Sequence, residues 1–246
     1  MHSEKLNAFV LSTLDYGDSD RIVNLFTLEY GRLKAFARGA RKSRKRFGAA
    51  LELFAHIDAQ LKVKEGLCSF QQAEIRQIYP AIRKELEKIA HAMYASELLD
   101  ALTPEGLALP RLFRLFSAYL DRLEAVPPTS MERRFFEINL LNILGYRPAL
   151  EECGNCASIY GESGAIVRLD GELVCSACSV SGPQLQPATL QTLQACLKTG
   201  IFGLVRFSDA ALAEAGILLD ASLEAHAGRR IKSADFLIQL LPGQDQ

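Results

Sequence analysis

Residues 51–63 read LELFAHIDAQLKV and carry an apolar side chain at every odd position. The even positions are polar, with Phe54 as the exception. Successive side chains of a strand point to opposite faces, so a period of two predicts one long strand with a buried face. This stretch therefore places a β-domain in the first third of the chain.

Shorter strand candidates lie around it, at residues 8–14, 21–28, 32–38 and 68–75. Turn sequences separate the first three, namely Asp15-Tyr16-Gly17-Asp18 and Tyr30-Gly31. Five short strands predict a small closed barrel, and an OB-fold has that strand count. A five-stranded SH3-like barrel fits the pattern nearly as well.

After Pro80 the apolar period becomes helical, beginning with Ile82, Leu86, Ile89 and Met93. A second helix is predicted through residues 112–123, and Thr129 with Glu132 forms a capping box for a third that stops near Gly145. Two more helices are expected over 187–198 and 209–227. The fold class is thus α+β, with a five-stranded barrel domain at 1–80 and an all-helical domain at 81–246 that carries a cysteine-bearing insertion at 150–183.

Charge is distributed unevenly along the 246 residues. The net charge is -1, but residues 1–80 hold 13 Lys and Arg against 9 Asp and Glu. A local basic surface can bind phosphates whatever the total, because salt screens each charge beyond about 10 Å. The N-terminus has no signal-peptide core, and no apolar run is long enough to span a membrane. We therefore expect a cytoplasmic protein that does not associate with membranes.

Four of the six cysteines form two C-x-x-C knuckles, Cys153–Cys156 and Cys175–Cys178, with eighteen residues between them. In a reducing compartment this spacing predicts one tetrahedral zinc rather than disulfides. Four thiolates leave no open position for water or substrate, so the zinc should be structural. Asp170-Gly171 between the knuckles predicts a hairpin with a tight primed turn. Cys68 and Cys196 stand alone and are interpreted as core residues.

The segment RGARKSRKRFG, residues 38–48, has six cations and no acid. Its mutual repulsion predicts a flexible loop, and the neighbouring strand adds Arg32, Lys34 and Phe36 on one face. A solvated loop without function is the simpler alternative, and Phe36 could equally be a core residue. The candidate DNA-binding residues are Arg32, Lys34, Arg38, Arg41, Lys42, Arg44, Lys45 and Arg46.

Familiar catalytic motifs are missing. The sequence has no phosphate loop, no G-x-G-x-x-G, no G-x-S-x-G and no H-E-x-x-H, so a non-enzymatic protein is expected. Asp15, Asp18 and Asp20 could bind a divalent ion, but carboxylates in such turns more often accept backbone hydrogen bonds.

Taken together, these segments resemble the bacterial RecO family of DNA repair proteins over nearly the whole chain. The matching pieces are Phe9–Leu11, Asp15–Val23, Phe26-Thr27, Gly31, Phe47–Leu51, Phe135–Glu137, Leu144–Tyr146, both cysteine knuckles and Gly228–Ser233.

The resemblance implies an N-terminal OB-fold at 1–80 and a helical domain at 81–246 with a zinc-ribbon-like insertion at 150–183. It further implies a protein that binds single- and double-stranded DNA and anneals complementary strands. It also implies partners, namely RecR and single-strand-binding protein, with which such proteins load RecA on coated DNA. DNA contact is implied mainly for the OB-fold and its basic loop. Arg229, Arg230 and Lys232 are candidates for a second basic surface, although helix-end cations complementing the helix dipole explain them about as well. The rival interpretations are a zinc-containing RNA-binding factor and a zinc enzyme acting on nucleic acid.

Overall fold

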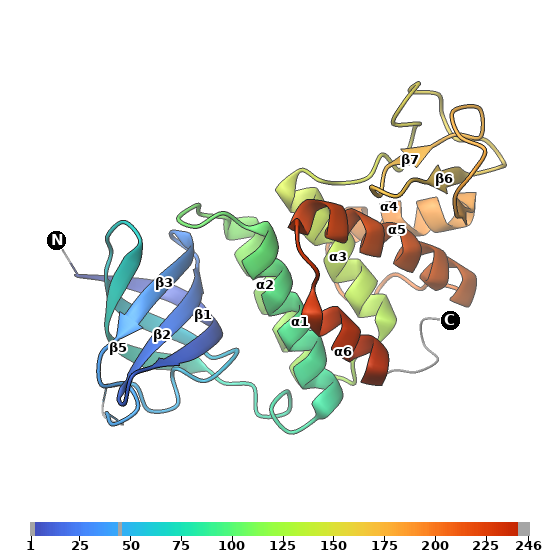
Figure 1. The fold of residues 1–246 in the computed structure, drawn as a ribbon. Coiled ribbons are helices and arrows are strands. Elements are labelled where there is room, and N and C mark those ends of the chain that lie inside the picture. Colours follow the sequence, from blue (N-terminus) through green and yellow to red (C-terminus); the bar gives the residue numbers. More distant parts are fainter. Residues whose placement is uncertain (1–2, 44–45, 241–246) are drawn as a thin grey trace. The chain divides into compact units, whose positions relative to one another are not determined.

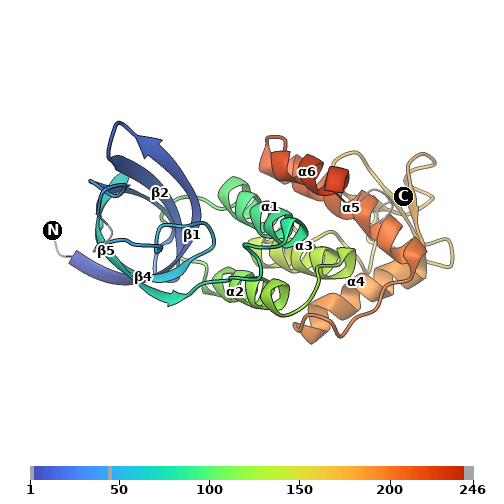
Figure 2. The ribbon, with the colours of Figure 1, turned by 90° about the horizontal axis from the view of Figure 1, so that it is seen from below.

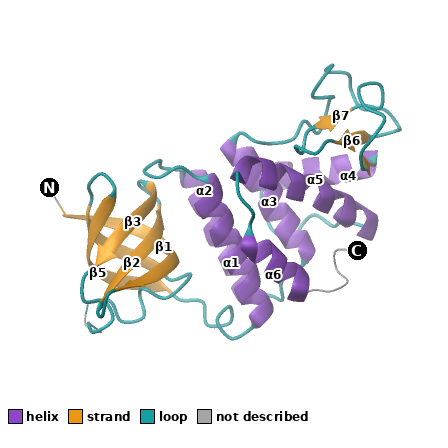
Figure 3. Ribbon diagram, in the orientation of Figure 1, coloured by secondary structure: helices purple, strands orange, loops and turns teal. Residues whose placement is uncertain are grey.

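The computed structural model describes residues 3–43 and 46–240. The chain divides into two compact units, Met1–Ala125 and Val126–Gln246. Strands dominate the first eighty residues and helices most of the remainder (Figure 3). In the described ranges, no helix combines the length and the apolar character needed to cross a membrane.

The first unit begins with a closed barrel of five strands (Figure 1). They are β1 (Ser3–Tyr16), β2 (Asp20–Thr27), β3 (Gly31–Ala37), β4 (His56–Lys62) and β5 (Leu67–Gln77). The order is β1-β2-β3-β5-β4, with β1 pairing antiparallel to β4 and β3 pairing parallel to β5. A simple meander would pair β3 with β4, so the insertion of β5 between them confirms the OB-type barrel over the SH3-like alternative.

The expected single strand from Leu51 to Val63 is wrong at its start. Residues 51–55 form turns, and β4 begins only at His56. Phe54 adopts a left-handed φ of 66°, and its N–H donates to the Val10 carbonyl at 2.9 Å. Leu51 is buried in the barrel core. The apolar residues of this segment thus pack into the barrel from a connection instead of extending the strand.

Two helices pack against the outside of the barrel, α1 (Leu86–Leu102) and α2 (Pro110–Ala125). Figure 2 shows both beside the strands. Phe9 and Phe26 point away from the barrel core and meet Phe113 of α2, with ring centroids at 5.0 and 6.0 Å. Phe116 adds an edge-on contact with Phe9 at 5.2 Å. These aromatic contacts bury one half of the outer face of β1 and β2.

The turn between β2 and β3 makes a second contact in this unit. Gly31 has a φ of +64°, and a Cβ there would lie 1.8 Å from the Leu107 carbonyl oxygen. Only glycine fits so close an approach. Next to it, the Arg32 guanidinium lies 3.1 Å from the Asp100 carboxylate and donates to the Thr103 carbonyl at 3.2 Å.

The second unit is built on α3 (Ser130–Leu144), α4 (Pro187–Thr199), α5 (Asp209–Ala227) and α6 (Lys232–Leu240). Thr129 is confirmed as the N-cap of α3, because its side chain accepts from the Glu132 N–H at 3.4 Å. The return hydrogen bond of the capping box, from the Thr129 N–H to the Glu132 side chain, stays a prediction. Gly145 ends α3 in the left-handed conformation. The sequence had not predicted α6.

The cysteine-bearing insertion contains a small sheet, ordered β7-β6-β8. Its strands are β6 (Ala165–Val167), β7 (Leu173–Val174) and β8 (Gln184–Leu185). The predicted hairpin joins β6 to β7, but its turn is not primed. The Gly171 N–H donates to the Arg168 carbonyl, and Gly171 has a φ of +76° while Asp170 does not have a positive φ. This is a three-residue loop with a glycine bulge, because a type I′ turn needs positive φ at both central residues and a type II′ turn needs it at the first.

Candidate metal centre and nucleic-acid interface

The two knuckles come together, as their spacing predicted. The Sγ atoms of Cys153, Cys156, Cys175 and Cys178 all lie within 4.8 Å of one another. Cys175 directly follows β7, so the hairpin carries the second knuckle back to the first. The Sγ atoms of Cys156 and Cys175 are 3.7 Å apart, a spacing suited to two ligands of one tetrahedral ion.

Backbone and side-chain N–H groups surround the sulfur atoms. The Cys175 N–H donates to Cys153 Sγ at 3.2 Å, and Asn155 Nδ2 donates to Cys178 Sγ at 3.3 Å. Burial alone would raise the pKa of Cys153, but the N–H groups around it, including that of Cys175, lower it to about 6. Four sulfurs, with donors stabilising the thiolate form, fit a soft divalent ion such as zinc.

The remaining two cysteines lie elsewhere. Cys68 is buried in the barrel core and Cys196 is buried on α4. Burial raises the pKa of Cys196 to about 12, so its thiol stays protonated at neutral pH. Both have the core positions expected for unpaired cysteines.

The basic loop leaves the end of β3, and its described part is held in place. The Gly39 N–H donates to the Asp20 carboxylate at 2.7 Å, and the Arg41 N–H donates to the Ser19 carbonyl at 3.0 Å. Arg46 donates to the Arg38 carbonyl at 2.6 Å. The described residues therefore form hydrogen-bonded turns, and the flexibility of the loop stays a prediction. Arg44 and Lys45 lie outside the described residues.

The side chains of the basic loop differ in their surroundings. Arg38, Lys42 and Arg46 are exposed, whereas the Arg41 guanidinium lies 3.6 Å from the Asp15 carboxylate. Arg46 also lies over the ring of Phe47, 5.0 Å from its centroid. Cations thus project from a hydrogen-bonded turn at one end of the barrel.

The cations of β3 are less accessible to a phosphate group than those of the basic loop. The Arg32 side chain is only 16% exposed and is engaged with Asp100. Lys34 is half exposed and lies 3.8 Å from the Glu105 carboxylate. Both point away from the barrel core, as the alternation of β3 predicted.

The acidic cluster of the β1–β2 turn has structural partners. Asp15 binds Arg21 at 2.8 Å, and this hydrogen bond lowers the pKa of Asp15. The Gly39 N–H likewise lowers the pKa of Asp20. Asp20 thus accepts a backbone hydrogen bond, the role that was preferred to metal binding, whereas Asp15 pairs with arginine side chains.

The C-terminal cations occupy the connection between α5 and α6. Arg229 and Arg230 follow the end of α5, where they can complement the helix dipole, but Lys232 begins α6. Arg230 binds Asp235 at 2.8 Å. The helix dipole therefore accounts for Arg229 and Arg230 but not for Lys232.

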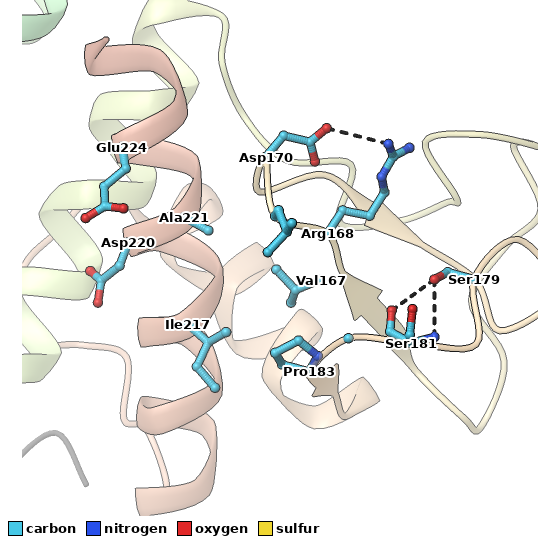
Figure 4. A pocket seen from close by; sticks show the side chains of 12 residues that line it. Val167, Arg168, Asp170, Ser179, Ser181, Pro183, Ile217, Asp220, Ala221 and Glu224 are labelled. Atoms are coloured by element: carbon cyan, nitrogen blue, oxygen red, sulfur yellow. Dashed lines mark hydrogen bonds and ion pairs between the residues drawn. The ribbon is translucent and has the colours of Figure 1, made fainter. Parts of the chain in front are cut away.

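A groove of about 790 Å³ lies between the β6–β7 hairpin and α5 (Figure 4). Val167 and Pro183 face Ile217 across it, and Asp220 and Glu224 line the α5 side. Arg168 pairs with Asp170 on the hairpin side at 3.8 Å. The groove therefore has an apolar floor, and the carboxylates of Asp220 and Glu224 lie on the side of α5 away from the hairpin.

Sequence reasoning missed Tyr16, which ends β1 and is 57% exposed. Its ring meets Phe36 edge to face, with centroids 5.8 Å apart. Phe36 is thus an outer-face residue of the barrel, not a member of its core cluster. Extending the period of two from Leu14 would have placed Tyr16 on the same face as Leu14, but only the strand register sets that face beside Phe36.

Comparison with known proteins agrees with this architecture. Residues 1–79 match the family model described as Recombination protein O N terminal, and residues 83–235 match Recombination protein O C terminal. The chain is 62% identical to the DNA repair protein RecO of Pelobacter propionicus, over 98% of each chain. It is 46% identical to the DNA repair protein RecO of Geobacter sulfurreducens, over 98% of this chain and all of the relative. With the OB-type barrel, the helices and the cysteine cluster in place, the chain belongs to the RecO family of DNA repair proteins.

Proposed function

We propose that this protein is a non-enzymatic mediator of recombinational repair, which binds single- and double-stranded DNA and anneals complementary strands. The observation that carries the proposal is the cluster of exposed cations at the end of β3. Phosphate contacts by Arg and Lys supply affinity without sequence preference. Arg38, Arg41 and Lys42 are the described residues best placed for this role, and Arg44, Lys45 and Arg46 continue the same segment. Arg32 serves mainly to join β3 to α1.

Annealing needs no catalytic group. Two polyanionic strands approach slowly, and a basic surface lowers their repulsion. The rate of pairing should therefore rise without ATP and without any change in strand length.

The cysteine cluster holds one zinc ion in this proposal. Cys153, Cys156, Cys175 and Cys178 saturate a tetrahedral ion, which joins the two ends of the insertion. Its role is stability of the second unit, because no coordination position remains for a substrate. A zinc enzyme acting on nucleic acid would need such a position.

The proposed partners are RecR and single-strand-binding protein, with RecA loaded as the consequence. An acidic tail of a single-strand-binding protein needs an apolar and basic pocket. The groove of Figure 4 is a poor match, because the one cation among its lining residues, Arg168, is already paired with Asp170.

A strand-annealing assay tests the proposal directly. Labelled complementary oligonucleotides are mixed bare and coated with single-strand-binding protein, without ATP, and duplex formation is followed with time. We expect acceleration in both arms. Acceleration of bare strands alone would contradict the proposed contact with single-strand-binding protein. Cleavage of the strands or a dependence on ATP would favour the enzyme interpretation. Competition between DNA and RNA oligonucleotides distinguishes the DNA-binding proposal from the RNA-binding alternative, which predicts that RNA competes better.

A further inference from the structure

The outer face of β1, β2 and β3 has two halves with different surroundings. At one half, Phe9 and Phe26 are covered by α2. At the other half, Leu14 is 64% exposed and Tyr16 is 57% exposed. A sheet face that stays apolar where no helix of its own unit covers it requires an explanation.

Strand register gathers these apolar side chains into one patch. Leu14 lies directly opposite Ile22, and Ile22 lies directly opposite Phe36. Tyr16 follows on the same face of β1, with its ring at 82° to that of Phe36. Four apolar side chains from three strands thus form a continuous surface, which we call the ring patch (Leu14, Tyr16, Ile22 and Phe36).

Cations flank the ring patch. Arg21, next to Ile22, and Arg41 of the basic loop share the carboxylate of Asp15, at 2.8 and 3.6 Å. The Arg41 N–H is bonded to Ser19 in the β1–β2 turn, which holds the basic loop beside this end of the patch. Asp20 lies directly opposite Tyr16, and Asp18 lies in the same turn. Because Gly39 of the basic loop donates to Asp20, Arg38 and Lys42 also lie at this end of the barrel. Four cations (Arg21, Arg38, Arg41 and Lys42) therefore outnumber three acids (Asp15, Asp18 and Asp20) there.

Aromatic surface beside positive charge matches an unpaired nucleotide, which offers a flat base and a phosphate together. Base–aromatic stacking contributes about 1–3 kcal/mol per base and is tolerant of sequence. Duplex DNA keeps its base faces stacked inside the helix, so the protein can bind it here only through its phosphates. An apolar peptide would not explain the cations at the edge of the patch.

We infer that Tyr16 and Phe36 form a stacking platform for unpaired bases of single-stranded DNA, and that this platform gives the protein a preference for single strands over duplex. The inference rests on the proposed DNA-binding function and adds the element that recognises bases. The basic loop supplies phosphate contacts common to both kinds of DNA, and the platform supplies the difference between them.

The test is binding measured by fluorescence anisotropy with three probes: a single-stranded oligothymidylate, an abasic oligonucleotide of the same length, and a duplex. Wild-type protein should bind the oligothymidylate more tightly than the abasic strand. Tyr16→Ala should weaken oligothymidylate binding by about 5- to 150-fold, which is the stacking contribution expressed as an affinity ratio. Binding of the abasic strand and duplex should change less than twofold, and the salt dependence should keep its slope.

Two further variants make the result specific. Tyr16→Phe keeps the ring and should retain wild-type affinity for every probe. Ile75→Ala removes another exposed apolar side chain of the barrel, 47% exposed on β5, and should also leave all three affinities unchanged.

Failure of the proposed function and failure of the stacking platform give different results. Wild-type protein that binds none of the probes would overturn the proposed function and this inference with it. Normal DNA binding with unchanged affinity in Tyr16→Ala would overturn the platform alone. Equal loss on all three probes, or a change in molecular mass without loss of DNA binding, would also overturn it, because the patch would then serve folding or self-association.

Discussion

Arg134 of α3 donates to both carboxylate oxygens of Asp220 on α5, through Nη1 at 2.6 Å and Nη2 at 3.3 Å. The same Nη1 donates to Glu137 at 2.8 Å, and Arg134 and Glu137 are almost completely buried. A buried carboxylate is tolerated only with such a partner. The Arg134–Asp220 pair therefore joins two helices of the second unit, and the Arg134 side chain within it is shielded from solvent.

Removing the cation should destabilise the second unit strongly. We expect Arg134→Met to lower the free energy of unfolding by about 3–5 kcal/mol, because Glu137 would remain buried without that partner. Urea denaturation followed by circular dichroism measures the loss. Asp220→Asn is the matched control, since Asp220 is 53% exposed and can be solvated. Equal stability of Arg134→Met and wild type would contradict this account.

Zinc should be present at about one ion per chain. We expect Cys175→Ser to lose the ion and to lower the melting temperature, because metal binding is coupled to folding of the insertion. Elemental analysis and thermal melting give the two measurements. Cys68→Ala removes a cysteine outside the cluster and should retain the zinc. A metal-free protein of full stability would refute the prediction.

Salt dependence should report the number of phosphates that the basic loop contacts. Four to six contacts predict a slope of about -3 to -4 for single strands, from roughly -0.7 per contact. Neutralising Arg44, Lys45 and Arg46 together should flatten it by about two units. Because Arg46 also anchors the loop, Arg38→Gln with Lys42→Gln gives a second test, with an expected change of about 1.4 units.

Lys62→Gln with Lys64→Gln is the control for this measurement, since it removes the same charge from exposed positions elsewhere on the barrel. Its slope should stay close to that of wild type. If the loop variants leave the slope unchanged, the binding surface lies elsewhere, and Arg229, Arg230 and Lys232 are the next positions to test.

His56 should make the barrel sensitive to mild acid. Burial lowers its pKa below the usual value of 6.5, helped by the charge of Arg76, while Asp58 and Asp121 oppose the shift. The unfolded chain therefore binds a proton more readily than the folded one, so His56 contributes stability above pH 6.5 that is lost as the pH falls through the lowered pKa.

Chemical denaturation at a series of pH values between about 5 and 8 tests this sign. His56→Gln should be less stable at neutral pH, because the ring stacks on Phe9 with centroids 4.3 Å apart, but its stability should vary less with pH. Asp15 and Asp20 titrate below their usual range and do not enter this window. A parallel pH dependence in both proteins would assign the effect to other groups.

Alternation of apolar residues predicted the barrel well wherever one strand face is buried. Ala55, Ile57, Ala59 and Leu61 all lie in the core as expected. The same pattern failed over residues 51–54, because Leu51 and Phe54 are buried from turns and not from a strand. Periodicity indicates which side chains are buried, but it does not show whether they are buried from a strand or from a turn.

The cysteine cluster could be predicted because metal ligation imposes a spacing that is visible in the chain. The ring patch could not, since it depends on which residues of three strands lie opposite one another. Arg32 shows the same limit. Its place on the outer face followed from β3, but its burial against Asp100 depends on α1, which is far away in sequence.

The strand order of the barrel has a consequence for biosynthesis. Because β3 meets β5 and not β4, and Ser3 pairs with Lys62, the barrel cannot close until the chain has been made as far as Gln77. Contacts between such distant residues slow folding, since the entropy of closing long loops is lost before the contacts form. A nascent chain that ends within the β4–β5 connection leaves the edges of β3 and β4 open to other strands. Premature termination there should give aggregation rather than a smaller folded domain.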